Sequence, residues 1–312
     1  MRYILEKYNG LKSRFDCPQC NGKKTFTKYI DTETKEYLSD HVGRCNKIDK
    51  CEYHFKPKQF FADNKEYTQI YKPQQKKIAP PPKPMFTIPI EQLDATLTHY
   101  ESNNFALILL KLFGEHETVK LLDLYKIGTS KKWNGANIFW QKDANGIVRT
   151  GKIMLYNIET NKRVKQPYEH ISWVHKDILK DGHELRQCFF GEHLINQFKT
   201  KTIAIVESEK SAIICTYFLP EYVWLSAGNI NGLSIEKFKV LSGRKVVLFP
   251  DLGKANDIWQ QKANEFKHIA EVSISDYLQR IATKEQRANA LDLADYLIET
   301  IIKNVGHVDN VA

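Results

Sequence analysis

Four cysteines with the spacing of a metal site lie near the start of the sequence. Cys17 and Cys20 are separated by two residues, and Cys45 and Cys51 follow after a gap of 24 residues. Two thiolate pairs at this spacing can bind one ion with the tetrahedral geometry that suits zinc. A site closed by four protein ligands is structural, because it leaves no position for a substrate. We therefore predict an N-terminal zinc ribbon.

Basic and aromatic side chains are interleaved with these cysteines. Residues 1–84 carry 18 basic and 10 acidic side chains, so they supply most of the chain's net charge of +9. This charge can neutralise phosphates, and a solvated basic face is the alternative. The nearby aromatic residues either stack on the bases of a single strand or form a small core. The predicted phosphate-binding residues of this module are Lys23, Lys24 and Arg44.

A second chemical cluster follows two apolar runs near the C-terminus. Glu207, Glu209 and Lys210 come directly after TIAIV (202–206), and Asp251 comes after VVLFP. The carboxyl ends of parallel strands meet at one edge of a sheet, where ligands bind. Two carboxylates at that edge can hold Mg²⁺ for phosphoryl transfer. The alternative is an ordinary helix start with favourable acidic charge, and Lys210 either meets a phosphate or pairs with Glu209.

Three segments and a linker must position these residues. From residue 199 to 312, β-branched runs alternate with helical stretches, which predicts a parallel α/β domain. Residues 86–198 combine a predicted helix from Gln92 to Phe113 with short alternating runs, which predicts an α+β domain. Residues 71–85 are rich in proline and lysine and predict a stiff linker. Residues 1–70 form the zinc-ribbon module.

Basic residues also punctuate the end of the middle segment. They are Arg149, Lys152, Arg163 and Lys165. If this stretch is a hairpin that turns at Thr160–Asn161, these side chains line one side of it and can contact phosphates. Solvated charges on a strand are the alternative.

Composition excludes several classes of protein. With 42% hydrophobic and 27% charged residues among 312, the chain is neither wholly disordered nor a coiled coil. The longest apolar stretch, Phe105 to Phe113, is interrupted by Lys111 and is too short to span a bilayer. The start, MRYILEKYNG, lacks the apolar centre of a signal peptide. We therefore expect a cytoplasmic protein with no membrane partner.

Several motifs resemble those of a known group of proteins. IVESEKSA followed by LFPDLG resembles the Toprim domain of bacterial primases, type IA and II topoisomerases and some nucleases. The four-cysteine module resembles the zinc-binding domain that precedes the primase catalytic core across a linker. With CPQC, HVGRCNKIDKCEYHFKP, FWQKDANGIVRTGKIMLYN and GEHLI, the whole layout is similar to an uncharacterised primase-like family found on bacterial mobile elements.

The resemblance assigns roles to acidic residues. Glu207 matches the Toprim glutamate and Asp251 matches the first aspartate of the Asp-x-Asp motif, so both are the expected catalytic residues. Gly253 replaces the second aspartate, and Asp257 is the candidate to supply the missing carboxylate to Mg²⁺ or Mn²⁺. Asp292 and Asp295 fall in the zone where primase-type Toprim domains often carry another acidic group.

The resemblance also implies a function. We expect a primase-like protein that makes short primers on single-stranded DNA from nucleoside triphosphates, for replication or transfer of a mobile element. Arg149, Lys152 and Lys210 would meet phosphates, and a helicase or relaxase is the expected protein partner. Two alternatives stay open: a Toprim-type nuclease with the same carboxylates, and a non-catalytic accessory protein that binds single-stranded DNA.

Overall fold

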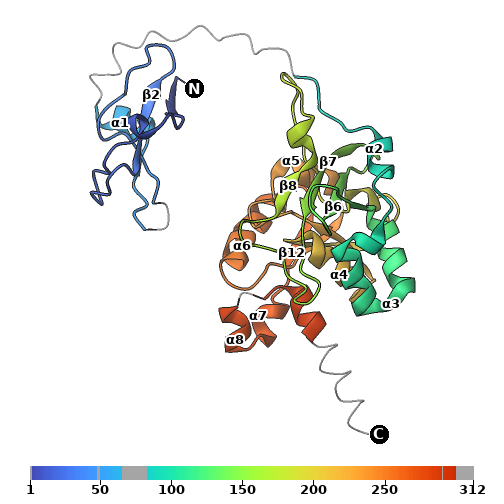
Figure 1. The fold of residues 1–312 in the computed structure, drawn as a ribbon. Helices are drawn as coiled ribbons and strands as arrows, with labels where there is room; N and C mark the ends of the chain where they lie inside the picture. Colours follow the sequence, from blue (N-terminus) through green and yellow to red (C-terminus); the bar gives the residue numbers. More distant parts are fainter. Residues whose placement is uncertain (1, 48–49, 65–82, 290, 300–312) are drawn as a thin grey trace. The chain divides into compact units, whose positions relative to one another are not determined.

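The computed structural model of the chain describes residues 2–47, 50–64, 83–289 and 291–299. The chain divides into two compact units, Met1–Pro81 and Pro82–Ala312 (Figure 1). Residues 71–82 of the predicted linker lie outside the described residues, so each unit is described by itself. None of the helices in the described ranges combines the length and the apolar character needed to cross a membrane.

The first unit is a small antiparallel sheet. Its strands, in spatial order, are β1 (Tyr3–Leu5), β2 (Phe26–Asp31), β3 (Gly43–Cys45) and β4 (His54–Phe55). The 3-10 turn η1 (Leu11–Ser13) follows β1, and helix α1 (Pro57–Asp63) follows β4. Its buried apolar cluster consists of Phe26 and three of the cysteines, with Phe15 and Tyr53 packed against them. A core this small contributes little stability, so a bound metal ion would be needed to stabilise the fold.

The second unit begins with helices and an antiparallel sheet. Strands β5 (Ile127–Thr129), β6 (Asn137–Lys142), β7 (Val148–Met154) and β8 (Ile171–Trp173) pair in sequence order. Short 3-10 turns η4 (Val174–Asp177) and η5 (Glu192–Leu194) follow this sheet. The turn between β7 and β8 includes Asn161 with a positive φ of 55°, and an isolated bridge joins Tyr156 to Arg163. A hairpin turn at Thr160–Asn161 is therefore confirmed.

The predicted helix from Gln92 to Phe113 is wrong in its bounds. The structure has a short helix α2 (Ile90–Asp94), a 3-10 turn η3 (Tyr100–Ser102) and a longer helix α3 (Asn104–Tyr125) with a kink at Gly114. The side chain of Asn103 accepts hydrogen bonds from the backbone N–H groups of Phe105 and Ala106. This N-cap starts a new helix inside the predicted one.

The last part of the second unit contains a parallel sheet. Its strands lie in the order β10 (Tyr222–Ser226), β9 (Thr202–Val206), β11 (Lys245–Leu248) and β12 (Glu271–Ile274), and all three pairings are parallel. The predicted strand TIAIV and the helix EKSAIICTYF are confirmed as β9 and α4 (Glu209–Phe218). The connections contain α5 (Ile235–Phe238), η6 (Lys239–Leu241) and α6 (Lys254–Phe266). Helices α7 (Tyr277–Ile281), α8 (Lys284–Ala288) and the helical residues 293–299 follow β12.

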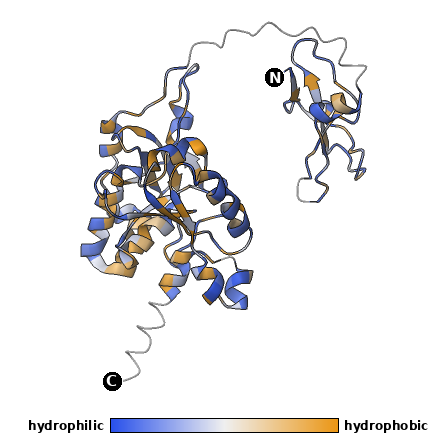
Figure 2. Ribbon diagram, turned by 180° about the vertical axis from the view of Figure 1, so that it is seen from behind, coloured by the Kyte–Doolittle hydropathy of each residue, from blue (hydrophilic) through white to orange (hydrophobic). Residues whose placement is uncertain are grey.

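The two sheets of this unit share one apolar core. A single cluster of buried residues includes Phe105 of α3, Phe139 of β6, Ile205 of β9 and Trp259 of α6. The Tyr125 hydroxyl donates a hydrogen bond to the carbonyl oxygen of Trp224 at 2.9 Å, which ties the end of α3 to β10. Many strand residues at the centre are hydrophobic, whereas the helices carry both hydrophilic and hydrophobic residues (Figure 2). The boundary at residue 198 stays a prediction.

Candidate functional site

The four predicted zinc ligands come together in the first unit. The sulfur atoms of Cys17, Cys20, Cys45 and Cys51 all lie within 4.8 Å of one another. The sulfurs of Cys17 and Cys51 are 3.7 Å apart, and those of Cys20 and Cys45 are 4.0 Å apart. A tetrahedral zinc ion with Zn–S bonds of about 2.3 Å requires sulfurs roughly 3.8 Å apart. The four thiols therefore lie close to the arrangement that a tetrahedral zinc ion requires.

A backbone hydrogen bond lies close to each pair of thiols. The backbone N–H of Asn21 donates to the carbonyl of Cys17 at 2.9 Å, and that of Cys51 donates to the carbonyl of Lys47 at 2.9 Å. The two histidines nearby serve other contacts: the ring of His54 exchanges a hydrogen bond with the Tyr29 hydroxyl at 2.9 Å, and that of His41 with Ser39 at 3.0 Å. The ligand set is therefore four sulfurs.

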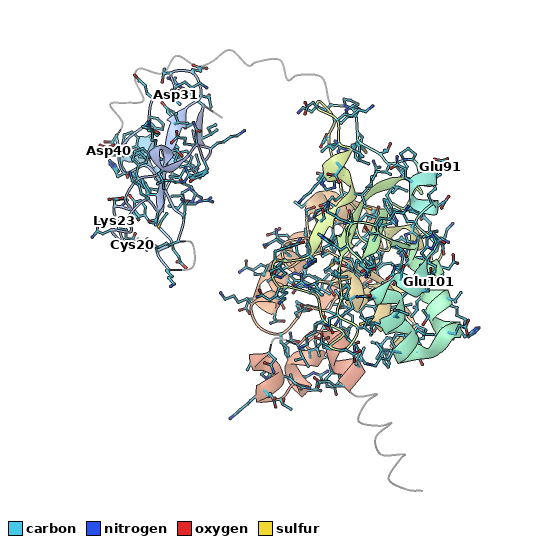
Figure 3. All side chains as sticks on the ribbon, viewed as in Figure 1. Cys20, Lys23, Asp31, Asp40, Glu91 and Glu101 are labelled. Atoms are coloured by element: carbon cyan, nitrogen blue, oxygen red, sulfur yellow. The ribbon has the colours of Figure 1, made fainter. Side chains whose placement is uncertain are left out.

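Basic side chains cover part of this unit. Lys23, Lys24 and Arg44 are exposed, and Lys23 follows the ligand Cys20 by three residues (both labelled in Figure 3). Lys28 is instead buried, with its ammonium 2.7 Å from a carboxylate oxygen of Asp40. Phe26 is fully buried, so it belongs to the core and cannot stack on a base.

The predicted acidic residues line a cavity of about 500 Å³ in the second unit. Glu207 follows β9 and precedes the N-cap Ser208 of α4, and Asp251 lies three residues beyond β11. The parallel pairing of β9 and β11 brings both carboxylates to the same edge of the sheet. The Oε1 atom of Glu207 is buried and has no hydrogen-bond partner among the described residues.

Two more carboxylates enter this cavity from the C-terminal segment. Asp292 and Asp295 both line it, and Asp257 is not among its lining residues. Asp257 lies in the first turn of α6. Asp292 caps the following helix, because its Oδ1 accepts the backbone N–H of Asp295 at 2.7 Å. The C-terminal segment thus brings the cavity two carboxylates in place of the Asp257 side chain.

The concentration of negative charge shifts the pKa values of these groups. Burial raises the pKa of Glu207 to about 6, with a further rise from Asp292, while a hydrogen bond from the Asp251 backbone opposes the shift. Burial, followed by the charges of Asp292 and Glu207, raises the pKa of Asp251 far above its usual range. A cation in the cavity would therefore relieve both desolvation and repulsion.

These carboxylates suit a Mg²⁺ ion that keeps several water ligands, rather than an ion bound by protein ligands alone. Among the described residues, the four cysteines are the only group of three or more candidate side chains placed to hold a metal ion together, so the cavity carboxylates do not enclose an ion by themselves. Mg²⁺ usually keeps several waters and takes only one or two carboxylates, with substrate phosphates completing its shell. The pair Glu207 and Asp251, with one unpartnered buried oxygen, suits that mode of binding.

Basic side chains line the same cavity. Lys162, Arg163 and Lys165, from the loop between β7 and β8, are exposed. Lys152 is buried, and its ammonium lies 3.0 Å from a carboxylate oxygen of Glu209 and 2.9 Å from the carbonyl of Gly228. The predicted phosphate ligands Arg163 and Lys165 are therefore accessible here, whereas Lys152 is engaged in an ion pair.

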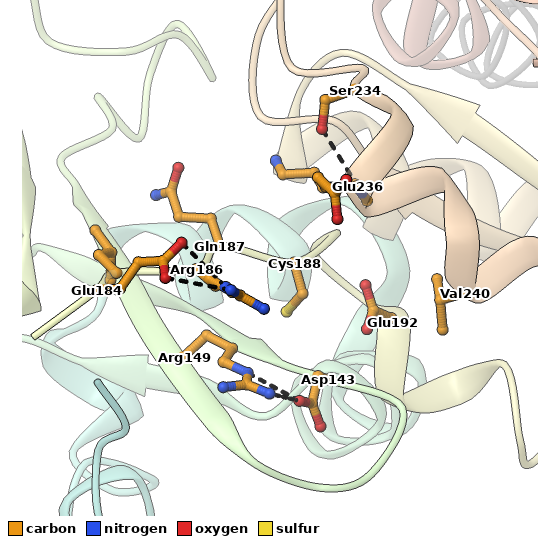
Figure 4. Close-up of a pocket in the computed structure, with 12 residues that line it drawn as sticks. Asp143, Arg149, Glu184, Arg186, Gln187, Cys188, Glu192, Ser234, Glu236 and Val240 are labelled. Atoms are coloured by element: carbon orange, nitrogen blue, oxygen red, sulfur yellow. Dashed lines mark hydrogen bonds and ion pairs between the residues drawn. The ribbon is translucent and has the colours of Figure 1, made fainter. Parts of the chain in front are cut away.

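Arg149 belongs to a different cavity. This cavity has a volume of about 530 Å³ and is lined by residues that include Cys188, Glu192 and Lys237 (Figure 4). A guanidinium nitrogen of Arg149 lies 2.6 Å from an oxygen of Asp143, and both side chains are largely buried. The structure thus separates Arg149 from the cavity that holds Glu207.

The glycine at the expected second aspartate has its own structural role. Gly253 has a φ of +92° and is the N-cap of α6. An added Cβ at this position would meet no atom within 4 Å, so backbone conformation, and not space, disfavours another residue there.

The sequence did not indicate all residues of the cavity. Lys162, Asn229 and Tyr156 line it as well, and the Lys210 ammonium lies 2.7 Å from Asp295 rather than on Glu209. The only sequence signal for Lys162 was its position directly before the predicted residue Arg163. The partner of Lys210 lies 85 residues away in sequence, so no local pattern could reveal it.

Comparisons with known proteins give two family matches. Residues 1–66 match the model of a zinc beta-ribbon finger, which agrees with the four-cysteine cluster. Residues 103–252 match a domain of unknown function (DUF6371). A comparison with curated protein sequences gives no match.

The chain is also similar to solved primase structures. The primase fragment of the bacteriophage T7 primase-helicase is 12% identical, with 84% of this chain and 88% of that chain covered, at a TM-score of 0.34. The zinc-binding and RNA polymerase domains of the Aquifex aeolicus primase are 12% identical, with 97% of this chain and 85% of that chain covered, at a TM-score of 0.37. The RNA polymerase domain of Mycobacterium tuberculosis primase DnaG is 8% identical, with 64% of this chain and 80% of that chain covered, at a TM-score of 0.41. At TM-scores below 0.5, function must be inferred from the residues of the site itself.

Proposed function

We propose that the chain is a primase-like nucleotidyltransferase that makes short primers on single-stranded DNA. The observation that carries this proposal is the cavity in which Glu207 and Asp251 lie with the exposed residues Arg163 and Lys165. Carboxylates that attract a divalent cation, next to basic groups that attract phosphates, are the two requirements of phosphoryl transfer.

The proposed roles follow from the position of each group. Glu207 and Asp251 would hold a Mg²⁺ or Mn²⁺ ion, which supplies charge neutralisation for the transferred phosphates. Lys162, Arg163 and Lys165 would bind the phosphates of the incoming nucleotide or of the primer. In the first unit, Lys23, Lys24 and Arg44 would bind the backbone of the single-stranded template.

The parallel sheet and its acidic edge support a Toprim domain as the catalytic part of this proposal. The order β10-β9-β11-β12, with Glu207 and Asp251 after its two central strands, agrees with the motifs that resemble Toprim sequences. In this proposal the primers serve a mobile element, and the protein partner is a helicase or a relaxase. Asp257 is replaced as a candidate metal ligand by the residues that line the cavity.

The test is template-dependent incorporation of labelled nucleotides. The full-length chain is incubated with single-stranded DNA, labelled ribo- or deoxynucleoside triphosphates, and Mg²⁺ or Mn²⁺. We expect labelled oligomers from the wild type and none from Glu207→Gln, which removes one charge and changes little else. Asp257→Asn is the matched control, because it makes the same kind of change outside the cavity, and it should retain synthesis.

The alternatives give different results in the same assay. DNA that is shortened without added nucleotides, in a reaction lost in Glu207→Gln, would identify a nuclease. DNA that stays intact and bound, with no labelled product under either metal ion, would contradict an enzymatic role and leave an accessory protein that binds single-stranded DNA.

A further inference from the structure

The four carboxylates of the cavity fall into two pairs with different surroundings. Asp295 is in direct contact with the Lys210 ammonium, and both oxygens of Asp292 accept short hydrogen bonds. Glu207 accepts a hydrogen bond from the Asp251 backbone, but its Oε1 atom is buried without a partner among the described residues. This asymmetry bears on how many divalent cations the cavity can bind, and it rests on the proposed function of the cavity as a phosphoryl-transfer site.

Lys210 supplies the positive charge to the first pair. It lies in the first turn of α4, and only 10% of its side chain is exposed. Its ammonium nitrogen is 2.7 Å from the Oδ1 atom of Asp295. Burial acts against the charged lysine, but the carboxylates of Asp292, Asp295 and Asp251 outweigh it and raise the pKa of Lys210. The ammonium therefore keeps its charge inside the acidic cluster.

Both oxygens of Asp292 are also occupied. Its Oδ2 accepts the hydroxyl of Ser211 at 2.6 Å, and its Oδ1 accepts the backbone N–H of Asp295. A metal ion on this pair would have to displace the Lys210 ammonium and compete with two short hydrogen bonds. A metal ion and the Lys210 ammonium are both positive, so burying both beside Asp292 and Asp295 would carry a large desolvation cost.

The second pair has the opposite character. The Oε1 atom of Glu207 is buried without a hydrogen-bond partner in the described part of the chain. Burial and the neighbouring carboxylates raise the pKa of Asp251 more strongly than the Lys210 charge lowers it. Gly253, which takes the place of the second Asp-x-Asp carboxylate, offers no further ligand. A cation that enters the cavity therefore gains most at Glu207 and Asp251.

We infer that Lys210 occupies the place of one of two cations, so that the cavity binds a single divalent ion, between Glu207 and Asp251. The ammonium is a fixed positive charge that does not dissociate with the product. Lys210 is thus assigned as a residue that sets metal stoichiometry, rather than as a free phosphate ligand.

The test counts Mn²⁺ ions by electron paramagnetic resonance on the full-length chain already loaded with zinc. We expect one Mn²⁺ per wild-type chain and two per Lys210→Met chain, because the variant frees the Asp292–Asp295 pair. Two ions in one cavity would also broaden each other's signal. Lys28→Met is the matched control: it removes a lysine that is similarly buried and also 2.7 Å from an aspartate, but in the other unit, and it should still bind one ion.

The outcomes separate this inference from the proposed function. Two ions on the wild type, or one ion on Lys210→Met with unchanged affinity, would overturn the role of Lys210 and leave nucleotidyl transfer possible. No Mn²⁺ on the wild type would overturn the proposed metal-dependent function itself. If Lys210→Met does not fold, Lys210→Gln serves in its place, because it keeps a hydrogen-bond donor for Asp295. It removes the same positive charge and should also bind two Mn²⁺ ions per chain.

Discussion

Lys152 of β7 and Glu209 of α4, which are 57 residues apart in sequence, form a buried ion pair at 3.0 Å. This pair joins the antiparallel sheet to the first helix of the parallel sheet, directly beside the carboxylate cavity. The carbonyl of Gly228 accepts a further hydrogen bond from the same ammonium at 2.9 Å. The ion pair therefore joins β7, the strand that precedes the loop with Arg163 and Lys165, to the start of α4.

Removal of one member of this pair should cost much more stability than removal of both. Lys152→Met leaves the Glu209 carboxylate buried without a counter-charge, and we expect a loss of about 3–5 kcal/mol. The double variant Lys152→Met/Glu209→Gln should recover a large part of that loss, because no unpaired charge is left. Denaturant unfolding of both single variants and the double variant measures the coupling. Purely additive losses would contradict the ion pair.

The zinc site makes a prediction that concerns the first unit alone. Cys45→Ser removes one of the four ligands, so metal analysis should no longer find one zinc ion per chain. The first unit should lose much of its stability with the ion, because structural zinc contributes on the order of 10 kcal/mol to the folding of small modules. The second unit should keep its unfolding transition, since its core contains none of the four ligands. Cys188→Ala, which changes a buried cysteine far from the cluster in sequence, should keep one zinc ion per chain. Full zinc content in Cys45→Ser would contradict the ligand assignment.

Arg163, which we predict to contact phosphates, should contribute to the binding of single-stranded DNA. Arg163→Ala removes an exposed cation at the cavity and should lower the affinity at every sequence, with a salt dependence reduced by about one phosphate contact. Arg186→Ala, an exposed arginine in the other cavity, is the control and should change neither quantity. Fluorescence anisotropy at several salt concentrations measures both. An equal loss in the two variants would mean that only net charge matters.

Arg149→Ala should act on stability instead. The change leaves Asp143, whose side chain is only 7% exposed, without its partner, and we expect a loss of about 3 kcal/mol.

Glu192 should make stability depend on pH. Its two oxygens accept the backbone N–H groups of Ala144 and Phe189, but burial is the stronger effect and raises its pKa to about 7. The folded chain then holds a proton that the unfolded chain releases, so stability falls as pH rises from about 4.5 through 7. The contribution is at most about 3 kcal/mol. Glu192→Gln should show a smaller decrease of melting temperature between pH 5.5 and 8 than the wild type, and an identical decrease would contradict this assignment.

The sequence predicted the parts of the fold that depend on local pattern. The apolar run TIAIV gave the bounds of β9, and the polar residues after it gave the start of α4, where Ser208 is the N-cap. The cysteine spacing predicted the cluster because the two ligands of each pair lie close together along the chain. The predicted helix across Asn103 failed because an apolar periodicity on both sides concealed an N-cap between two helices.

Long-range contacts could not be predicted in the same way. Glu209 and Lys210 are neighbours in sequence, but successive helical side chains point in different directions, so each has its own distant partner. Lys152 binds the first and Asp295 the second. Arg149 and Lys152 were expected to contact phosphates because their charge was visible, while the buried carboxylates that pair with them were not.

The position of a bound cation is the most direct test of a divalent-cation site at Glu207 and Asp251. Crystals of the full-length chain soaked in Mn²⁺ would be measured for anomalous scattering at the manganese and zinc edges. We predict one manganese peak between the carboxylates of Glu207 and Asp251, with zinc at the four cysteines. Manganese on Asp292 and Asp295 instead, or no manganese in the cavity, would contradict the account.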